Sequence, residues 1–176
     1  MIFGDRNIFA IDADLTQEGL YACINYCFWI RNQLVGDKTI TSLLTTELDF
    51  ISNVIDKKGK RYCNIERVST VTLTDYLINN IWNPEDTFTT IDNVYIAKDI
   101  LNNLDIGSNA SESFTQFYLF VIECNGYDWF LLKDGNANKY IDIKIPKNNF
   151  YQVFEHLKKW IDDSTSLALN SYINRR

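Results

Sequence analysis

The sequence has few of the residues that mark fibrous or disordered chains. Only two prolines and seven glycines occur among its 176 residues, which excludes collagen-like and low-complexity material. Hydrophobic residues make up 46% of the chain and aromatic residues 14%, enough to bury the core of one ordinary domain. We therefore expect residues 1–176 to form a single globular domain.

Positive charge is also scarce. The chain has 17 Lys and Arg against 23 Asp and Glu, a net charge of −6 and a pI near 4.7. Nucleic acids and anionic membrane surfaces attract proteins with an excess of positive charge, so neither is an expected partner. A basic protein is the favoured partner, because complementary charge speeds encounter.

Long hydrophobic runs are absent as well. No stretch approaches the roughly 18 apolar residues of a membrane span. The first residues, Met1–Arg6, include an acidic side chain and lead into no sustained apolar run, which is not the pattern of a signal peptide. We expect a cytoplasmic protein.

Residues typical of active sites are sparse. The one histidine, His156, lies beside the apolar face of a predicted helix, and the chain has no Gly-x-Ser-x-Gly turn and no glycine-rich phosphate loop. The pair Asp12 and Asp14 has no further ligands nearby in sequence, and Asp134–Asn138 begins like a calcium loop but lacks its later Gly and Glu. The sequence therefore predicts no catalytic residue, no metal site and no cofactor, although carboxylates that meet only in space stay open as an alternative.

The four cysteines have irregular spacing. This is typical of buried free thiols rather than of a disulfide framework.

The N-terminal half predicts two strands and then two helices. Ile8–Asp14 alternates apolar and acidic residues, and Leu20–Ile30 is almost continuously apolar, as in a central strand. Leucine and isoleucine then recur at helical spacing between residues 44 and 55, with Thr41 or Ser42 as the expected cap. A shorter helix is predicted over Asp75–Trp82, capped by Thr74 and ended by Asn83-Pro84.

The C-terminal half predicts a meander and a covering helix. We expect a strand at Val94–Ala97, a polar loop over residues 102–113, and then strands at Phe117–Glu123, Tyr127–Leu132 and Ile141–Ile145. The final helix has an apolar face of Phe150, Val153, Phe154, Leu157 and Ile161. The order of elements predicts an α+β fold, with a mainly antiparallel sheet and helices packed on one face.

Acidic residues are concentrated in the middle of the chain. Residues 84–130 contain eight Asp and Glu and a single Lys. A solvated face that aids solubility is one interpretation, and a docking surface for a cationic partner is the other. The residues nominated for such docking are Asp92, Tyr95, Asp99, Asp105, Glu112 and Asp128.

Several short segments resemble a family of bacterial immunity proteins, the immunity protein 42 family. The similar segments are Met1–Asp5, Phe9–Ile11, Cys27–Ile30, Leu34–Asp37, Thr41–Leu43 and Trp129–Leu132. The resemblance implies a non-enzymatic antitoxin that binds the C-terminal domain of a polymorphic toxin, such as those delivered by contact-dependent or type VI machinery. The matched residues look like determinants of the fold and do not mark the toxin-binding surface. A hydrolase that reverses a toxin's modification and a scaffold unrelated to toxins are the alternatives.

Overall fold

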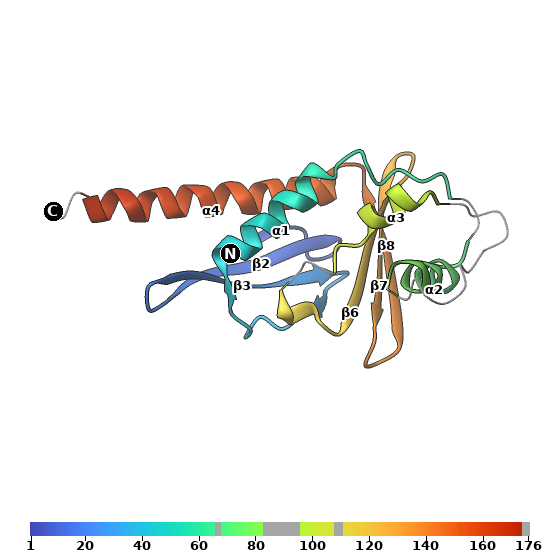
Figure 1. Cartoon of the computed structure of the whole chain (residues 1–176), viewed down its shortest axis with the longest axis horizontal. Coiled ribbons are helices and arrows are strands. Elements are labelled where there is room, and N and C mark those ends of the chain that lie inside the picture. The colour runs from blue at the N-terminus through green and yellow to red at the C-terminus, as the bar shows by residue number, and fades with distance from the viewer. Residues whose placement is uncertain (66–67, 83–95, 108–110, 174–176) are drawn as a thin grey trace.

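The protein has an α+β fold in which the strands form two antiparallel sheets and the helices pack against both of them (Figure 1). The computed structural model describes residues 1–65, 68–82, 96–107 and 111–173, with side chains described as far as Ser166. The predicted fold class is confirmed. The strands divide into two sheets, and each sheet has its own helical layer.

The first sheet comes from the N-terminal part of the chain and is built around a long hairpin. Its strands are β1 (Ile2–Gly4), β2 (Phe9–Glu18), β3 (Tyr21–Ile30), β4 (Gln33–Val35) and β5 (Ser42–Leu43). Their order is β1-β2-β3-β4, and β5 also pairs with β3. Arg31 and Asn32 join β3 to β4 with φ of 49° and 61°, because a two-residue hairpin turn favours positive φ.

The second sheet is the C-terminal meander that the sequence predicted. Its strands are β6 (Phe117–Glu123), β7 (Tyr127–Asp134) and β8 (Lys139–Pro146), in that order. Gly126, in the turn between β6 and β7, has a φ of 83°, as expected for the Asn-Gly pair.

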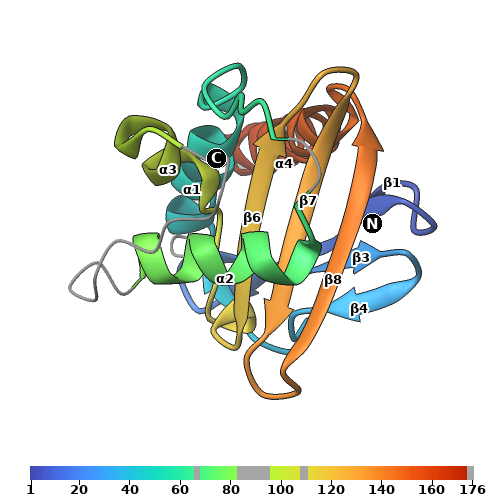
Figure 2. The same ribbon diagram turned by 90° about the vertical axis from the view of Figure 1, so that its right-hand side faces the viewer.

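Four α-helices and one short 3₁₀ helix complete the described fold. They are α1 (Leu44–Asp56), α2 (Thr70–Ile81), α3 (Lys98–Leu104), α4 (Asn149–Ile173) and η1 (Glu112–Phe114). Helices α1 and α4 lie on one side of the first sheet, and the C-terminal part of α4 projects past the body of the protein (Figure 1). Helices α2 and α3 pack on the face of the second sheet that points away from the first sheet, and α2 crosses in front of that face in Figure 2. No helix in these described segments is long and apolar enough to cross a membrane.

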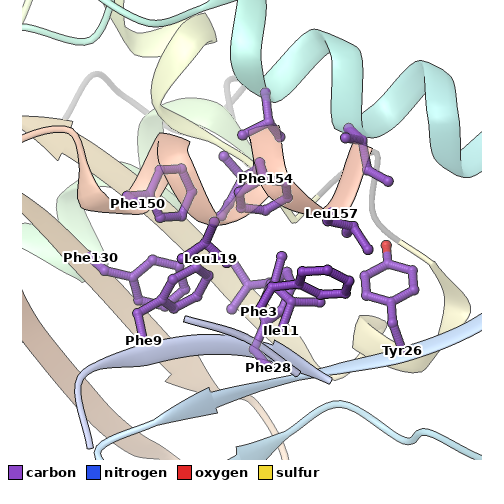
Figure 3. Close-up of a cluster of buried hydrophobic side chains, with 14 of the residues drawn as sticks. Phe3, Phe9, Ile11, Tyr26, Phe28, Leu119, Phe130, Phe150, Phe154 and Leu157 are labelled. Atoms are coloured by element: carbon purple, nitrogen blue, oxygen red, sulfur yellow. The ribbon is translucent and has the colours of Figure 1, made fainter. Parts of the chain in front are cut away.

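Two hydrophobic clusters hold these layers together. The main cluster joins the first sheet, α1, α4 and one face of the second sheet through aromatic side chains such as Phe9, Phe28 and Phe130 (Figure 3). The second cluster joins the other face of the second sheet to α2 and α3, with Phe120 and Leu131 at its centre. The second sheet is thus buried on both faces, which explains why the sequences of β6 and β7 are almost continuously apolar.

Three local predictions were wrong. Helix α3 occupies the start of the expected loop over residues 102–113. Of the strand expected at Val94–Ala97, Ile96 and Ala97 lie outside any strand, and residues 94–95 are outside the described residues. Helix α2 starts at Thr70 with Ser69 as its cap, five residues before the predicted start. Helix α1 has no side-chain cap. The hydroxyls of Thr41 and Ser42 hydrogen-bond elsewhere, to Asn25 and Ser111.

Candidate functional site

The most distinctive surface is the face of the first sheet that points away from the main core, here called the outer face. Phe9, Ile11 and Ala13 of β2 belong to the main cluster, so the residues between them point the opposite way. Both α1 and α4 pack on the core side, and no described helix covers the outer face (Figure 1). Its members on the two long strands are Ala10, Asp12, Asp14, Thr16, Glu18, Tyr21, Cys23, Asn25, Cys27 and Trp29.

Exposed hydrophobic side chains gather on this face. Among the described residues nine large hydrophobic side chains are exposed, and six of them lie on the outer face, at its N-terminal edge or at the β2–β3 hairpin tip: Met1, Ile2, Leu20, Tyr21, Leu34 and Leu43. Leu20 is 96% exposed and Tyr21 67%. A concentration of exposed apolar side chains rimmed by polar groups is typical of a protein interaction surface.

A lysine and two carboxylates occupy the centre of the outer face. Lys38 Nζ lies 2.6 Å from Asp12 Oδ1 and 2.7 Å from Asp14 Oδ2. Burial alone would lower the pKa of Lys38, but its hydrogen bonds to Asp12 and Asp14 outweigh that effect and raise the pKa. The hydrogen bond from Lys38 also lowers the pKa of Asp14. This centre therefore keeps its charges around neutral pH.

An open groove of about 510 Å³ runs from this centre toward the hairpin tip. Thr16 and Asn25 lie in its lining and hydrogen-bond to each other, and Asp14 and Glu18 line the same groove. The Glu18 carboxylate has no hydrogen-bond or ion-pair partner among the residues that the structure describes, and it lies opposite Tyr21 in the strand register. The groove thus places a free carboxylate beside an exposed aromatic ring.

Trp29 marks the other end of the outer face. The Arg6 guanidinium lies over its ring, 4.4 Å from the ring centroid. The indole nitrogen of Trp29 is inaccessible to solvent and has no hydrogen-bond partner in the described part of the chain. Exposed Leu34 lies directly opposite Trp29 across the β3–β4 pair.

The cysteines are structural, as predicted. All four are free and buried, and two of them, Cys23 and Cys27, lie on the outer face of β3. Burial raises the pKa of Cys27 to about 11, so its thiol stays protonated at neutral pH and is a poor nucleophile.

The six acidic-surface residues nominated from the sequence do not form one exposed patch. Asp99 on α3 and Glu112 on η1 are exposed, on separate elements. Asp105 and Asp128 are buried, so the expectation that they contribute to an exposed acidic surface was wrong. The remaining two, Asp92 and Tyr95, lie outside the described residues.

The two buried carboxylates are held by the fold. Asp105 is 6% exposed and accepts a 2.8 Å hydrogen bond from the backbone N–H of Gly107. Asp128 is fully buried, 3.4 Å from Lys147 Nζ, and accepts a 3.0 Å hydrogen bond from the backbone N–H of Asn148. Burial raises the pKa of Asp128, and the nearby Lys147 opposes that effect.

A signal for the outer face was present in the sequence. The alternation that identified the strand at Ile8–Asp14 continues through Thr16 and Glu18, so the polar side of β2 extends to the hairpin tip. What the sequence did not show is that this side is exposed from Asp14 to the hairpin tip, that Ala10, Cys23 and Cys27 on it are buried, and that the second sheet is covered on both faces.

The described ranges contain little that points to catalysis. No group of three or more His, Cys, Asp or Glu within them is placed to hold a metal ion. His156 is exposed and lines a cavity of about 150 Å³ together with Asp5 and Gln152. The features that the site does present, exposed apolar side chains around a charged centre, are those of a surface that binds another protein.

Comparison with known proteins gives this surface a family context. A model of the immunity protein 42 family matches residues 1–160, and the chain therefore belongs to that family. The resemblance noted in the sequence is confirmed, and the match covers all of the similar segments and the chain between them. No curated protein and no solved structure matches the chain.

Proposed function

We propose that this protein is a cytoplasmic antitoxin that binds a cognate toxin domain through its outer face and neutralises the toxin by stoichiometric occlusion. Membership of the immunity protein 42 family supports the role. The observation that carries the proposal is that six of the nine large hydrophobic side chains exposed in the described part of the chain lie on the outer face, at its N-terminal edge or at the hairpin tip.

The dimensions of the outer face suit a folded partner. Strands β2 and β3 have ten residues each, so the face is roughly 33 Å long, and four paired strands make it roughly 14 Å wide. Because β1 and β4 have only three residues each, the full width holds near Trp29 alone, and the flat area stays below roughly 460 Å². Side-chain relief and the hairpin tip add to it, toward the roughly 800 Å² that each partner contributes to a standard interface. A short peptide would leave much of the face uncovered.

The chemistry of the face divides into anchors and a polar surround. Tyr21 and Leu43 provide exposed apolar contact area near the hairpin tip, and aromatic side chains are frequent energetic centres of interfaces. Asp14, Glu18 and Lys38 provide charges that orient the partner and exclude mismatched surfaces. Bound there, the toxin domain loses access to its own substrate, and no turnover by the antitoxin is needed.

A basic toxin domain fits the charge of the whole chain. The net charge of −6 attracts a cationic partner over long range. Two exposed residues of the acidic surface, Asp99 and Glu112, stay proposed as secondary contacts. Asp92 and Tyr95 stay proposed as well, on the sequence alone.

The test is rescue from the toxin domain encoded beside this gene. We expect co-expression to protect cells and the two purified proteins to form an equimolar complex. Tyr21→Asp and Leu43→Asp should each abolish rescue, because a buried unpaired charge replaces an apolar contact. Val71→Asp on α2 is the matched control, since Val71 is 47% exposed and Leu43 is 49% exposed.

Two outcomes would contradict the proposal. Full rescue by both outer-face variants would place the interface elsewhere. Protection at far less than one antitoxin per toxin would point to the hydrolase alternative, because occlusion consumes one antitoxin molecule for each toxin.

A further inference from the structure

One unsatisfied donor, inaccessible to solvent in the free protein, lies on the outer face, so a ligand reaches it only when a neighbouring side chain moves. Three buried polar side-chain atoms in the described chain have no hydrogen-bond partner: Trp29 Nε1, Ser113 Oγ and Asp128 Oδ1. Ser113 and Asp128 belong to buried residues, and Asp128 Oδ1 has the ammonium of Lys147 nearby. Trp29 differs, because it belongs to the surface where exposed apolar side chains gather. An unpaired donor at such a surface calls for an acceptor.

The guanidinium that lies over the ring face of Trp29 is only loosely held. Arg6 lies over the indole ring, and its ion pair with Asp12 Oδ2 is long at 3.5 Å. The same carboxylate has a closer cation, because Lys38 Nζ lies 2.6 Å from its other oxygen. Arg6 is 43% exposed, so it can leave the ring without burying its charge and without leaving Asp12 unpaired.

Apolar side chains lie around this pair. Leu34, 53% exposed, lies opposite Trp29 in the β3–β4 register, and Ile2, 43% exposed, lies on the edge strand β1 beyond β2, opposite Asp12. A guanidinium and an indole N–H framed by exposed aliphatic side chains form a small site in which both polar groups are donors.

We propose that Trp29 is an anchor of the toxin interface and that a carboxylate of the toxin binds there, taking hydrogen bonds from the Arg6 guanidinium and the indole N–H together. The inference rests on the proposed function, since it names the chemistry of the partner on the same face. A carboxylate fits because it accepts several hydrogen bonds and pairs with an arginine, whereas a lysine or arginine of the toxin would be repelled by Arg6. Trp and Arg are also the residue types that most often dominate interface energetics.

A second copy of this chain is a poorer occupant. Each copy carries a net charge of −6, so self-association brings two acidic molecules together. For the toxin, the opposite ends of the outer face differ in charge: Glu18 has no partner among the described residues at the hairpin tip, whereas Arg6 lies over Trp29 at the other end. This polarity requires a toxin surface that offers a carboxylate at one end and a cation at the other.

The test measures affinity for the purified, catalytically inactivated toxin domain from the neighbouring gene. We expect Arg6→Gln and Trp29→Phe each to weaken binding by about tenfold, the loss expected for one charge-assisted hydrogen bond. The effect of Arg6→Gln should shrink in about 0.5 M salt, where charges are screened, while that of Trp29→Phe should persist. The double variant should lose less affinity than the product of the two single fold-losses, because Arg6 and Trp29 bind the same carboxylate.

Matched controls separate these effects from general changes. Trp82→Phe removes an exposed indole directly after α2, and Lys159→Gln removes an exposed positive charge on α4; both should bind like the parent protein. A thermal melt checks that each variant is folded. Arg6→Gln alters an exposed side chain, so it tests the proposal even if Trp29→Phe proves unstable.

A nuclear magnetic resonance experiment gives an independent readout. The indole N–H signal of Trp29, identified by its loss in Trp29→Phe, should move downfield when the toxin domain is added and should exchange more slowly with water. An unchanged signal together with unchanged affinity of both variants would overturn this inference. If Tyr21→Asp abolishes the complex with the toxin while the Trp29 signal and both affinities stay unchanged, the proposed function stands and only this inference fails. If the parent protein binds no toxin at all, the proposed function itself fails. A free protein that dimerises through Trp29 would identify a second copy as the occupant and overturn the proposal.

Discussion

The hydroxyl of Tyr26 donates a 2.6 Å hydrogen bond to the carboxylate of Glu47, and both side chains are buried. Tyr26 lies on β3 and Glu47 on α1, so the bond ties the first sheet to the helix above it. The backbone N–H of Ser111 donates to the same hydroxyl at 3.4 Å. Burial raises the pKa of Glu47, and its hydrogen bonds with Tyr26 and Ser42 only partly oppose that effect.

The raised pKa of Glu47 predicts a pH-dependent stability. Between the ordinary carboxyl pKa and the raised pKa of folded Glu47, the folded state binds more protons than the unfolded state. The stability that Glu47 contributes is therefore full below the ordinary pKa and is lost as the pH rises through the raised pKa. Glu47→Gln cannot ionise, and we expect its stability relative to the parent protein to be higher at about pH 8 than at about pH 4. Urea unfolding at the two pH values measures this, and an equal difference at both would contradict the prediction.

Removing the hydroxyl of Tyr26 should be harmful at neutral pH. Tyr26→Phe leaves the buried Glu47 carboxylate without this donor, and we expect a loss of about 2–3 kcal/mol in the free energy of unfolding. Tyr62→Phe is the matched control, because its hydroxyl makes an exposed hydrogen bond to Asn125. The control should change stability by less than about 0.5 kcal/mol, and equal losses in the two variants would refute the prediction.

Arg61 is a fully buried cation that joins three parts of the chain. Its guanidinium donates to the carbonyl oxygens of Val54 and Asn103 at 3.0 and 2.6 Å and to the hydroxyl of Tyr151 at 3.1 Å. That hydroxyl in turn donates to the buried carboxylate of Glu123. Arg61→Leu removes these donors, so we expect a loss of about 3–5 kcal/mol.

Lys60→Gln is the control for Arg61→Leu, because it removes the positive charge of the neighbouring residue, whose side chain is exposed. It should change the free energy of unfolding by less than about 0.5 kcal/mol. Chemical denaturation of the two variants gives the comparison. A loss below about 1 kcal/mol in Arg61→Leu would mean that the buried hydrogen bonds contribute little net stability.

Charge reversal can distinguish the outer face from the acidic residues of the middle segment. We expect Asp14→Lys with Glu18→Lys to weaken toxin binding by at least about tenfold at low salt and to flatten its salt dependence, because both carboxylates line the open groove. Asp99→Lys with Glu112→Lys, which changes the net charge by the same amount, should have a smaller effect. Affinity measured across a salt series decides, and the reverse ranking would move the interface to α3 and η1.

Gly4 is required by backbone geometry. It has a φ of 97°, and a Cβ at this position would lie 2.4 Å from the carbonyl oxygen of Phe9 and 2.8 Å from Val153 on α4. Gly59 also has a positive φ, of 83°, but open space around it. We expect Gly59→Ala to cost about 1 kcal/mol from backbone strain alone and Gly4→Ala to cost at least about 2 kcal/mol. Similar melting temperatures for the two variants would contradict this.

The sequence predicted the elements whose signals are local. The alternation in β2, the apolar runs of β3, β6 and β7, and the Asn125-Gly126 turn all depend on neighbours along the chain, and each was placed within a few residues. Helix α3 was missed because it spans only seven residues and buries just Leu101 and Leu104, too little for a helical period to show. The early start of α2 was missed because Ser69 and Thr74 are equally good caps by residue type.

The composition and order of the residues determined that this is an acidic α+β protein, because charge totals and hydrophobic periodicity are properties of the chain itself. Only the tertiary structure decided which acidic residues reach the surface: Asp99 is exposed, whereas Asp105 and Asp128 are buried. It also decided that the outer face of the first sheet stays open while the second sheet is covered on both sides. Burial depends on which layers pack together, and that packing joins residues far apart in the sequence.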